Sequence, residues 1–268
     1  MQTFVISLAN AYERRAFQQA QLYNLGISFH FIDAVSAEYL SNHDLTIALN
    51  RWERPLMPTE VACFFSHYNL WLRIAKSDEP ALILEDDAIL ADQLPLFLTH
   101  LQNTQGIEHL SLETRLRKKL IGLPQHLSND LSIAPLYQDR TGAAAYILWP
   151  KGAQKLIIKA KQQGAALADA FISNNYQLHS WQVLPALALQ ADVAEHYNVL
   201  STLKTHSYIQ ANDCKANYAA KGLQGMRYKL RRLQGQLRLA CRLLSRITHA
   251  RHILVPMGMC SLQSRPSR

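Results

Sequence analysis

Apolar and polar residues alternate in short blocks along most of this 268-residue chain. Short apolar runs are typical of buried strands, and apolar positions that recur every three or four residues predict helices that cover a sheet. Strands are predicted at 4–8, 27–32, 81–84, 108–112 and 143–148, and helices at 12–25, 44–50, 59–77, 95–102 and 151–163. Strands separated by helices predict an α/β fold with a largely parallel central sheet and helices on both faces.

One predicted strand continues directly into acidic residues. Ala81–Leu84 is apolar, and three carboxylates follow it, at Glu85, Asp86 and Asp87. An unpaired carboxylate is costly to bury, and adjacent ones repel each other. We therefore expect a hard divalent cation such as Mn²⁺ or Mg²⁺, which takes carboxylate oxygens and often substrate phosphates. A solvated acidic turn is the alternative. Ligands of parallel sheets bind at the carboxyl ends of strands, where this triplet falls.

The charge is distributed unevenly along the chain. From residue 214 onward there are 12 Lys or Arg residues and no Asp or Glu, whereas residues 1–213 hold 16 basic and 20 acidic residues. The formal net charge of +8 therefore comes entirely from the last fifth of the chain. This argues against a body that binds nucleic acid and for an anionic partner of the C-terminal segment. We expect two parts, a body at 1–213 and a tail at 214–268.

The tail contains a predicted amphipathic helix at residues 223–247. Its apolar positions are spaced by three and four residues and form one stripe, at Leu223, Met226, Leu230, Leu233, Leu237, Ala240, Leu244 and Ile247. The rest of its surface is basic, at Arg227, Lys229, Arg231, Arg232, Arg238, Arg242 and Arg246. Such a helix suits an anionic membrane surface. A coiled coil, whose positive flanks would repel in a parallel dimer, and packing of the stripe on the body are the alternatives.

Other features bear on the cellular setting. No run of 18 or more apolar residues occurs, so no transmembrane helix is expected. The N-terminus is interpreted as a first strand and not as a signal peptide, because it lacks a basic start and becomes polar by Asn10. The four cysteines, Cys63, Cys214, Cys241 and Cys260, show no disulfide-like density, which favours a reduced, cytosolic protein.

Four sequence blocks, in their order along the chain, resemble glycosyltransferase family 25. This family contains bacterial lipooligosaccharide glycosyltransferases and the collagen galactosyltransferases. The blocks are Val5–Leu8 with Glu13–Arg15 and Phe31–Val35, then Thr59–Trp71, then Leu82–Asp87, then Thr141–Leu148 with Gly152–Leu156. Weaker matches follow at Leu167–Phe171 and Val183–Gln190. One departure is Thr59, where the family usually has Gly, which alters the start of a helix.

The resemblance implies a GT-A-like fold for residues 1–213, a nucleotide-sugar donor and a metal site of the Asp-x-Asp type. Asp87 is the first candidate for direct metal contact, and Glu85, two residues earlier on an extended strand, points to the same side. Asp86 would point away, toward the donor ribose or a neighbouring amide. The metal would bridge the diphosphate and stabilise the departing UDP.

The resemblance also implies contacts to the donor from the first strand and the helix after it. Arg14 is expected to contact the donor pyrophosphate or to pair with an acidic residue of the site. Asp33 could accept a hydrogen bond from uracil or ribose, or cap the following turn. Further donor contacts are expected at Ser7, Leu8, Ser66 and His67, although a core role is equally open for His67.

Inversion at a sugar carbon needs a base that takes the proton of the acceptor hydroxyl. Asp169 is the only acid between Asp139 and Asp192, and its apolar neighbours would raise its pKa toward a useful range. An N-cap of a short helix is the alternative for Asp169. Acceptor contacts are expected at Tyr146, His179 and Trp181, because aromatic faces stack on sugars; core packing is the stronger alternative for Tyr146.

With the resemblance, these residues predict an inverting, metal-dependent glycosyltransferase. We expect transfer of galactose from UDP-galactose to a lipooligosaccharide at the cytoplasmic face of the inner membrane, where the tail attaches the enzyme peripherally. Transfer of glucose from UDP-glucose is the close alternative, and a sugar-nucleotide-binding or scaffold protein without turnover is the alternative of another class. A phosphotransferase is disfavoured, because no Gly-rich or Lys-rich phosphate loop is present.

Overall fold

The computed structural model describes residues 1–40, 51–101, 105–128, 130–139, 142–201, 203 and 222–260. The helices predicted at 12–25, 59–77, 95–102 and 151–163 are confirmed, whereas the one predicted at 44–50 lies outside the described residues. The helices are α1 (Tyr12–Asn24), α3 (Pro58–Ile74), α4 (Leu94–His100), α5 (Pro150–Gln163), α6 (Ala168–Ser173) and α7 (Gly222–Leu244), with the 3-10 helices η1 (Ala37–Tyr39) and η3 (Ala191–Tyr197).

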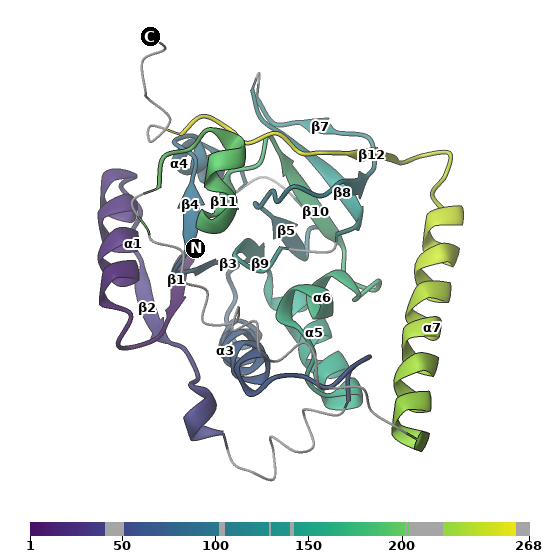
Figure 1. The fold of residues 1–268 in the computed structure, drawn as a ribbon. Coiled ribbons are helices and arrows are strands. Elements are labelled where there is room, and N and C mark those ends of the chain that lie inside the picture. Colours follow the sequence, from purple (N-terminus) through teal and green to yellow (C-terminus); the bar gives the residue numbers. More distant parts are fainter. Residues whose placement is uncertain are drawn as a thin grey trace.

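A large sheet forms the centre of the molecule (Figure 1). Its strands follow the order β12-β6-β8-β10-β5-β9-β3-β1-β2, β7 pairs with β8, and β4 and β11 form a separate pair. The strands are β1 (Gln2–Ser7), β2 (His30–Asp33), β3 (Ala81–Glu85), β4 (Ala88–Leu90), β5 (His109–Ser111), β6 (Lys119–Ile121), β7 (Gln125–His126), β8 (Ser132–Gln138), β9 (Ala145–Leu148), β10 (Ser180–Leu184), β11 (Ala188–Gln190) and β12 (Arg251–Ile253).

The large sheet is mixed, so the prediction of a largely parallel sheet is wrong. β1 runs parallel to β2 and β3, and β10 runs parallel to β5, but β9 is antiparallel to both β3 and β5. The strands from β10 outward to β12 also pair antiparallel. β6, β7 and β8 follow one another without an intervening helix, which favours antiparallel pairing. An apolar run predicts a strand but does not encode its direction.

Two apolar cores lie on opposite faces of the sheet because successive residues of a strand point to opposite sides. Phe4 and Ile6 of β1 pack in one core with α3, α5 and α6, and Val5 packs in the other with residues of α1 and α4. Figure 1 shows α3, α5 and α6 gathered on one side of the molecule. Helix α5 approaches β5 closely at Gly152, where a Cβ atom would lie 2.2 Å from the backbone oxygen of Glu108.

Helix α3 starts at Pro58, one residue before the predicted Thr59. The carboxylate of Glu60 accepts a hydrogen bond from the backbone N–H of Met57 at 2.9 Å, and Arg54 donates to the same carboxylate at 2.6 and 2.9 Å. These contacts satisfy the start of the helix through proline and glutamate. The departure from the family pattern at Thr59 therefore leaves the helix start intact.

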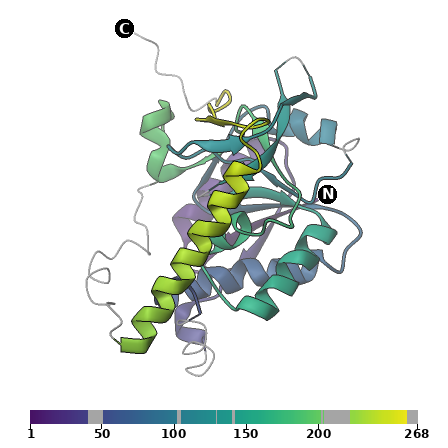
Figure 2. The same cartoon turned by 90° about the vertical axis from the view of Figure 1, so that its right-hand side faces the viewer.

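Helix α7 runs along the outside of the molecule (Figure 2). The side of the helix opposite its apolar stripe contacts the body. Tyr228 is buried, Arg231 donates to the carbonyl of Trp52 at 3.0 Å, and Arg242 donates to the carbonyl of Tyr137 at 2.5 Å. The apolar stripe faces outward, with exposed fractions of 51–77% at Leu223, Met226, Leu230, Leu233, Leu237, Leu244 and Ile247. These exposures exclude the alternative that the stripe packs on the body.

The chain returns to the sheet after α7. β12 pairs antiparallel with β6, and Val255 is fully buried. The backbone of Ala186 donates to Pro256 and accepts from Gly258, both at 2.8 Å. The predicted division at residue 213 stays a prediction, and residues 251–260 pack against the body. None of the helices in the described part of the chain is both long and apolar enough to span a bilayer.

Candidate active site

The acidic triplet lies where β3 ends and the chain turns into β4. Glu85 is the last residue of β3 and Ala88 is the first of β4, so the two aspartates form the turn between them. β1 runs beside β3 with Ile6 opposite Glu85, which brings Ser7 to the same edge of the sheet. This edge is the carboxyl end of two parallel strands, which is where the sequence placed the triplet.

Asp86 is buried and held on both of its carboxylate oxygens. Ser7 Oγ donates to Oδ2 at 2.7 Å, and Arg14 Nη1 donates to Oδ1 at 2.8 Å. Arg14 therefore pairs with an acidic residue of the site, which is one of the two roles predicted for it. Because β1 and α1 hold both Asp86 oxygens, this carboxylate fixes the turn and leaves Glu85 and Asp87 as the candidate metal ligands.

A chain of buried hydrogen bonds orients Glu85. The indole N–H of Trp71 donates to the hydroxyl of Tyr146 at 3.0 Å, and that hydroxyl lies 2.9 Å from His67 Nδ1. Since an indole only donates, the hydroxyl proton of Tyr146 is free to point to Nδ1, which leaves the ring proton of a neutral His67 on Nε2. Nε2 then donates to Glu85 Oε1 at 3.1 Å, while Gln190 donates to Oε2 at 3.3 Å.

Asp87 has the properties expected of a cation ligand. Its Oδ1 is buried and has no hydrogen-bond partner among the described residues. Burial, with the neighbouring charges of Glu85 and Asp86, raises the pKa of Asp87 to about 7. A buried carboxylate oxygen without a partner is costly, and a divalent cation shared with Glu85 would remove that cost. The two residues therefore fit the predicted Mn²⁺ or Mg²⁺ site.

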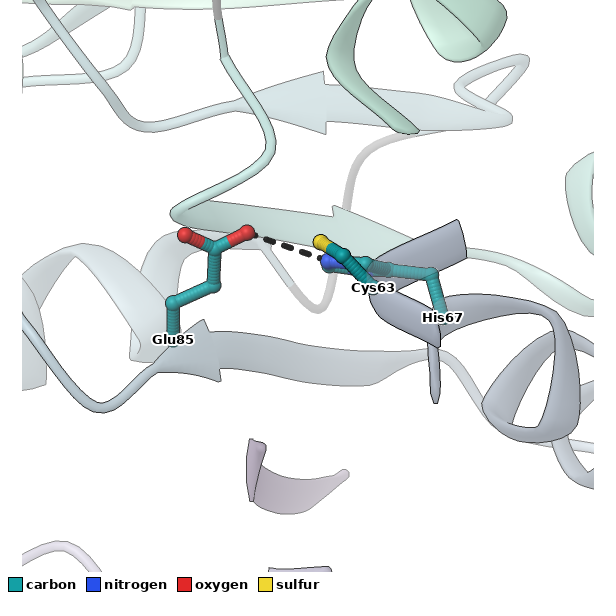
Figure 3. Close-up of side chains that lie close together, drawn as sticks. All are labelled: Cys63, His67 and Glu85. Carbon is teal, nitrogen blue, oxygen red and sulfur yellow. Dashed lines mark hydrogen bonds and ion pairs between the residues drawn. The ribbon is translucent and has the colours of Figure 1, made fainter. Parts of the chain in front are cut away.

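A second set of possible ligands lies beside the triplet. Cys63 and His67 on α3 and Glu85 on β3 bring a sulfur, a nitrogen and an oxygen within 4.8 Å of one another (Figure 3). This donor set would suit Zn²⁺. However, burial and the charge of Glu85 raise the pKa of the Cys63 thiol well above its usual value, which disfavours the thiolate. The Nε2 atom of His67 also carries the proton that it donates to Glu85, so this set is better described as a positioning network.

Arg15 organises the edge of the sheet at which Ser7, Leu8 and Asp33 lie. It donates to the backbone carbonyls of Leu8 and Ser7, each at 3.0 Å, and pairs with Asp33. Its guanidinium lies over the ring of Phe31, 5.0 Å from the centroid. Asp33 stands opposite Ser7 in the register of β1 and β2, so the structure brings these predicted donor residues together. Their contacts with a nucleotide stay predictions.

Two predicted site residues lie in the interior. Ser66 Oγ accepts from the backbone of Val35 and donates to the carbonyl of Ala62, both at 2.9 Å, so it fastens α3 to the loop after β2. This position argues against direct contact with a donor. Tyr146 is fully buried and its hydroxyl is engaged by Trp71 and His67, which agrees with the core alternative and argues against contact with an acceptor.

Asp169 lies in the first turn of α6, near enough to Glu85 for the two charges to interact. The helix is preceded by Leu167, so Asp169 is not its N-cap, and its Oδ1 accepts from the backbone N–H of Ala170 at 2.6 Å. Burial raises the pKa of Asp169, and the charge of the nearby Glu85 adds to the rise. A half-buried carboxylate with a raised pKa is suited to accept a proton.

The predicted acceptor residues His179 and Trp181 do not share a site with Asp169. Ser180, between them, lines a pocket with Asp169, whereas Trp181 packs in the core on the other face of the sheet. Neighbours on a strand point to opposite sides, which explains the separation. His179 is exposed, and its backbone N–H donates to Glu108 at 3.0 Å. The structure thus contradicts the expectation that Trp181 and Asp169 contact one acceptor.

Arg115 and Asp192 were missed by the sequence analysis. Their ion pair joins the loop after β5 to η3, across 77 residues of sequence. Asp192 contributes to the raised pKa of Asp87, and Arg115 opposes the rise in the pKa of Asp169, so both residues lie near the carboxylates of the site. No local signal marks either residue, because the pairing appears only when β11 places η3 beside β4.

Comparison with known proteins finds relatives whose names refer to saccharide biosynthesis or to glycosyltransferases. The chain is 28% identical over 205 residues to the lipooligosaccharide biosynthesis protein lic2B of Haemophilus influenzae, which covers 70% of this chain and 75% of that protein. It is 32% identical over 159 residues to the lacto-N-neotetraose biosynthesis glycosyltransferase LgtE of Neisseria meningitidis serogroup B, at 55% and 56% coverage. It is also 32% identical over 120 residues to the inactive glycosyltransferase 25 family member 3 of Mus musculus, at 41% and 20% coverage.

The sequence pattern described as glycosyltransferase family 25 (LPS biosynthesis protein) matches residues 1–172. The matched region is more than half of the chain and contains β1, α3, the acidic triplet and Asp169. The resemblance found in the sequence is thereby confirmed, and the chain belongs to glycosyltransferase family 25.

Proposed function

We propose that this chain is an inverting, metal-dependent glycosyltransferase with a GT-A-like arrangement. It transfers galactose from UDP-galactose to a lipooligosaccharide acceptor. The family and the printed names of the bacterial relatives support the reaction class and the acceptor class. The meeting of two strand ends at a carboxylate triplet, with Asp169 nearby, supports a donor site and a base on one side of the sheet.

Glu85 and Asp87 are the proposed ligands of Mn²⁺ or Mg²⁺. When bound, the ion would offset the negative charge of the donor diphosphate and of the departing UDP. The chain contributes the geometry: His67 and Gln190 fix the carboxylate of Glu85, and the contacts of Asp86 fix the turn. Ser7, Leu8 and Asp33 form the proposed edge for uridine, and Arg115 is a proposed cation partner of the diphosphate.

Asp169 is the proposed base. It takes the proton of the acceptor hydroxyl while that oxygen forms a bond to the anomeric carbon and the bond from that carbon to UDP breaks. Attack opposite the departing UDP inverts the anomeric centre. A pKa raised by burial strengthens the carboxylate as a proton acceptor at the pH where it is ionised.

The observation that carries this proposal is the buried Asp87 Oδ1 without a partner beside an oriented Glu85. Calorimetric titration of Mn²⁺ in the presence of UDP tests it. The wild-type chain should bind the ion, and Asp87→Asn should not. Asp78→Asn, which changes an exposed carboxylate in the turn before β3, is the matched control and should bind like the wild type. Equal binding by all three chains would contradict the site.

Two other functions compete with this proposal. UDP-glucose is the close alternative donor. A protein without turnover is the alternative of another class, and the relative from Mus musculus carries the word inactive in its name. The acidic triplet and Asp169 favour turnover in this chain. A hydrolysis panel over UDP-, GDP- and CMP-sugars, with and without Mn²⁺, separates these functions, since a scaffold would release no nucleotide from any donor.

Helix α7 is the proposed contact with an anionic membrane, at the cytoplasmic face of the inner membrane. Its apolar stripe faces away from the body, and the exposed Arg227, Lys229 and Arg238 flank it. Residues 214–268 contain no acid that would be repelled by anionic lipid. Apolar burial and charge attraction both favour such a surface. This geometry would keep the body, with its active site, at the lipid-linked acceptor.

A further inference from the structure

The ion pair between Arg115 and Asp192 lies near both carboxylates that the proposed reaction uses. Asp192 is close enough to Asp87, and Arg115 to Asp169, for each charge to act on the pKa of that neighbour. A guanidinium has several N–H donors, so its pairing with one carboxylate leaves donors that a phosphate can accept. The contacts that hold Arg115 in place therefore bear on the site.

The backbone that carries Arg115 has a strained conformation. Leu116, the next residue, has a φ of 26°, in the left-handed region that residues with a Cβ atom rarely adopt. The side chain of Leu116 is 45% exposed, so packing in the core does not hold this conformation. Polar contacts hold it instead, and they come from two segments that are far away in the sequence.

A directed chain of three hydrogen bonds reaches this loop. Thr114 is buried, and its hydroxyl donates to the carbonyl of Val255 at 2.6 Å. Because that hydroxyl has a single hydrogen, it acts as the acceptor in its contact of 3.1 Å with the hydroxyl of Tyr197. The oxygen of Tyr197 in turn accepts from the backbone N–H of Leu116 at 3.0 Å. The chain thus holds the two residues that flank Arg115.

Both anchors of this chain lie outside the region matched by the family pattern, which ends at residue 172. Tyr197 ends η3, which also carries Asp192, so one short helix supplies both the partner of Arg115 and a contact that holds its loop. Val255 is fully buried in the segment after β12, and this segment forms backbone hydrogen bonds with Ala186. The C-terminal part of the chain is therefore in direct contact with the loop of the site.

We propose that Thr114 is a positioning residue of the active site. Together with Tyr197 and the C-terminal segment at Val255, it holds the strained loop so that Arg115 faces the diphosphate of the donor. The contact with a diphosphate rests on the proposed function, whereas the support of the loop does not. The C-terminal segment then completes the donor site through Thr114.

Hydrogen exchange tests the support of the loop without any ligand. Thr114→Val keeps the shape of the side chain and removes the hydroxyl, so amide exchange in residues 113–118 should become about tenfold faster. Thr114→Ser keeps the hydroxyl and should exchange like the wild type. Thr99→Val, which removes an exposed hydroxyl on α4, is the matched control and should also leave the exchange of this loop unchanged.

Binding of UDP and of uridine, measured by NMR titration with Mn²⁺ present, tests the link to Arg115. Arg115→Met should weaken the affinity for UDP about tenfold and leave the affinity for uridine unchanged, because uridine has no phosphate. Thr114→Val should show the same pattern with a loss of about fivefold. A double variant with both changes should lose no more than Arg115→Met alone, since the hydroxyl acts through the guanidinium.

The outcomes separate this inference from the proposed function. Unchanged exchange of the loop in Thr114→Val would overturn the inference, and so would equal weakening of UDP and uridine or additive losses in the double variant. A wild-type chain that binds no UDP would contradict the proposed function and the diphosphate contact, while faster exchange in Thr114→Val would still support the holding of the loop. If Thr114→Val fails to fold, Tyr197→Phe removes the bond to Leu116 at a half-buried ring, and the same two measurements decide the question.

Discussion

His67 Nε2 lies 3.1 Å from Glu85 Oε1, and this contact joins the interior of α3 to the edge of the site. His67 is fully buried, so it reaches no substrate, yet it determines where the carboxylate of Glu85 points. Behind it, Tyr146 and Trp71 fix the ring through its other nitrogen. The core residues that the sequence linked to substrates thus act on the site through Glu85.

Replacing His67 by Gln should therefore reduce turnover without removing a substrate contact. We expect a fall of about tenfold in kcat, about 1.4 kcal/mol, because Glu85 loses its fixed orientation. The concentration of Mn²⁺ needed for half-maximal rate should rise in the same variant. Tyr146→Phe should show a smaller change of the same kind. A variant with normal metal dependence and a raised donor KM alone would show that His67 contacts the donor.

Replacing Asp169 by Asn should abolish transfer and leave donor binding intact. The base acts only on the acceptor hydroxyl, so we expect at least about a hundredfold loss in kcat with an unchanged affinity for UDP. In the wild type, the rate should rise with pH as the carboxylate ionises, at a pH above the usual range of aspartate. Loss of UDP affinity together with turnover would place Asp169 in the donor site.

Much of the fold was predictable from the sequence because it depends on local pattern. β1, α1, β3 and α5 lie within a few residues of their predicted bounds, since apolar periodicity and end signals such as Gly164 mark them. Strand direction was not predictable, because it depends on partners far along the chain. Strand β12 was not predictable for the same reason, because it pairs with β6, which lies far from it in the sequence, on the other side of α7.

The site was predictable where its residues are adjacent in sequence. The acidic triplet lies near Ser7 because each follows or ends a parallel strand, and the carboxyl ends of neighbouring parallel strands lie at one edge of the sheet. The partners of those residues could not be predicted. The sequence allowed two roles for Arg14, and the structure shows that it pairs with Asp86. No local sequence signal indicates the ion pair between Arg115 and Asp192. Trp181 was predicted to share an acceptor site with Asp169 because an aromatic ring can stack on a sugar and a carboxylate can accept its proton. The structure shows that the two side chains lie on opposite faces of the sheet.

Glu113 should make the stability of the metal-free protein fall as pH rises. Burial raises the pKa of Glu113 to about 8 from its ordinary value of 4.5. The folded state keeps this proton between those values while the unfolded state releases it, so the stabilisation is complete below about pH 4.5 and is lost as pH approaches 8. Thermal unfolding of Glu113→Gln should depend less steeply on pH over this window than the wild type. If the melting temperatures of the two proteins depend equally on pH, Glu113 is not protonated in the folded state.

Replacing outward leucines of α7 should release the protein from membranes without unfolding it. Leu230 and Leu237 are more than half exposed, so changing both to Ser should leave the melting temperature unchanged and reduce flotation with vesicles that contain phosphatidylglycerol. Leu123→Ser, at another exposed leucine, is the control. Binding of the wild type should weaken with salt. If the wild-type protein does not bind these vesicles at low salt, the proposed membrane role of α7 is wrong. Truncation at residue 213 is a poorer test, because it also removes β12 and Val255.

The most direct measurement is the release of UDP from UDP-galactose, with stereochemical analysis of the product, by purified wild type and Asp87→Asn with Mn²⁺ or EDTA. We predict an inverted galactosyl product on a lipooligosaccharide acceptor with the wild type and Mn²⁺. The loss in EDTA and in Asp87→Asn should be at least about a hundredfold, with Asp78→Asn unaffected. Near-normal turnover in EDTA or in Asp87→Asn, or a product with retained configuration, would contradict the account.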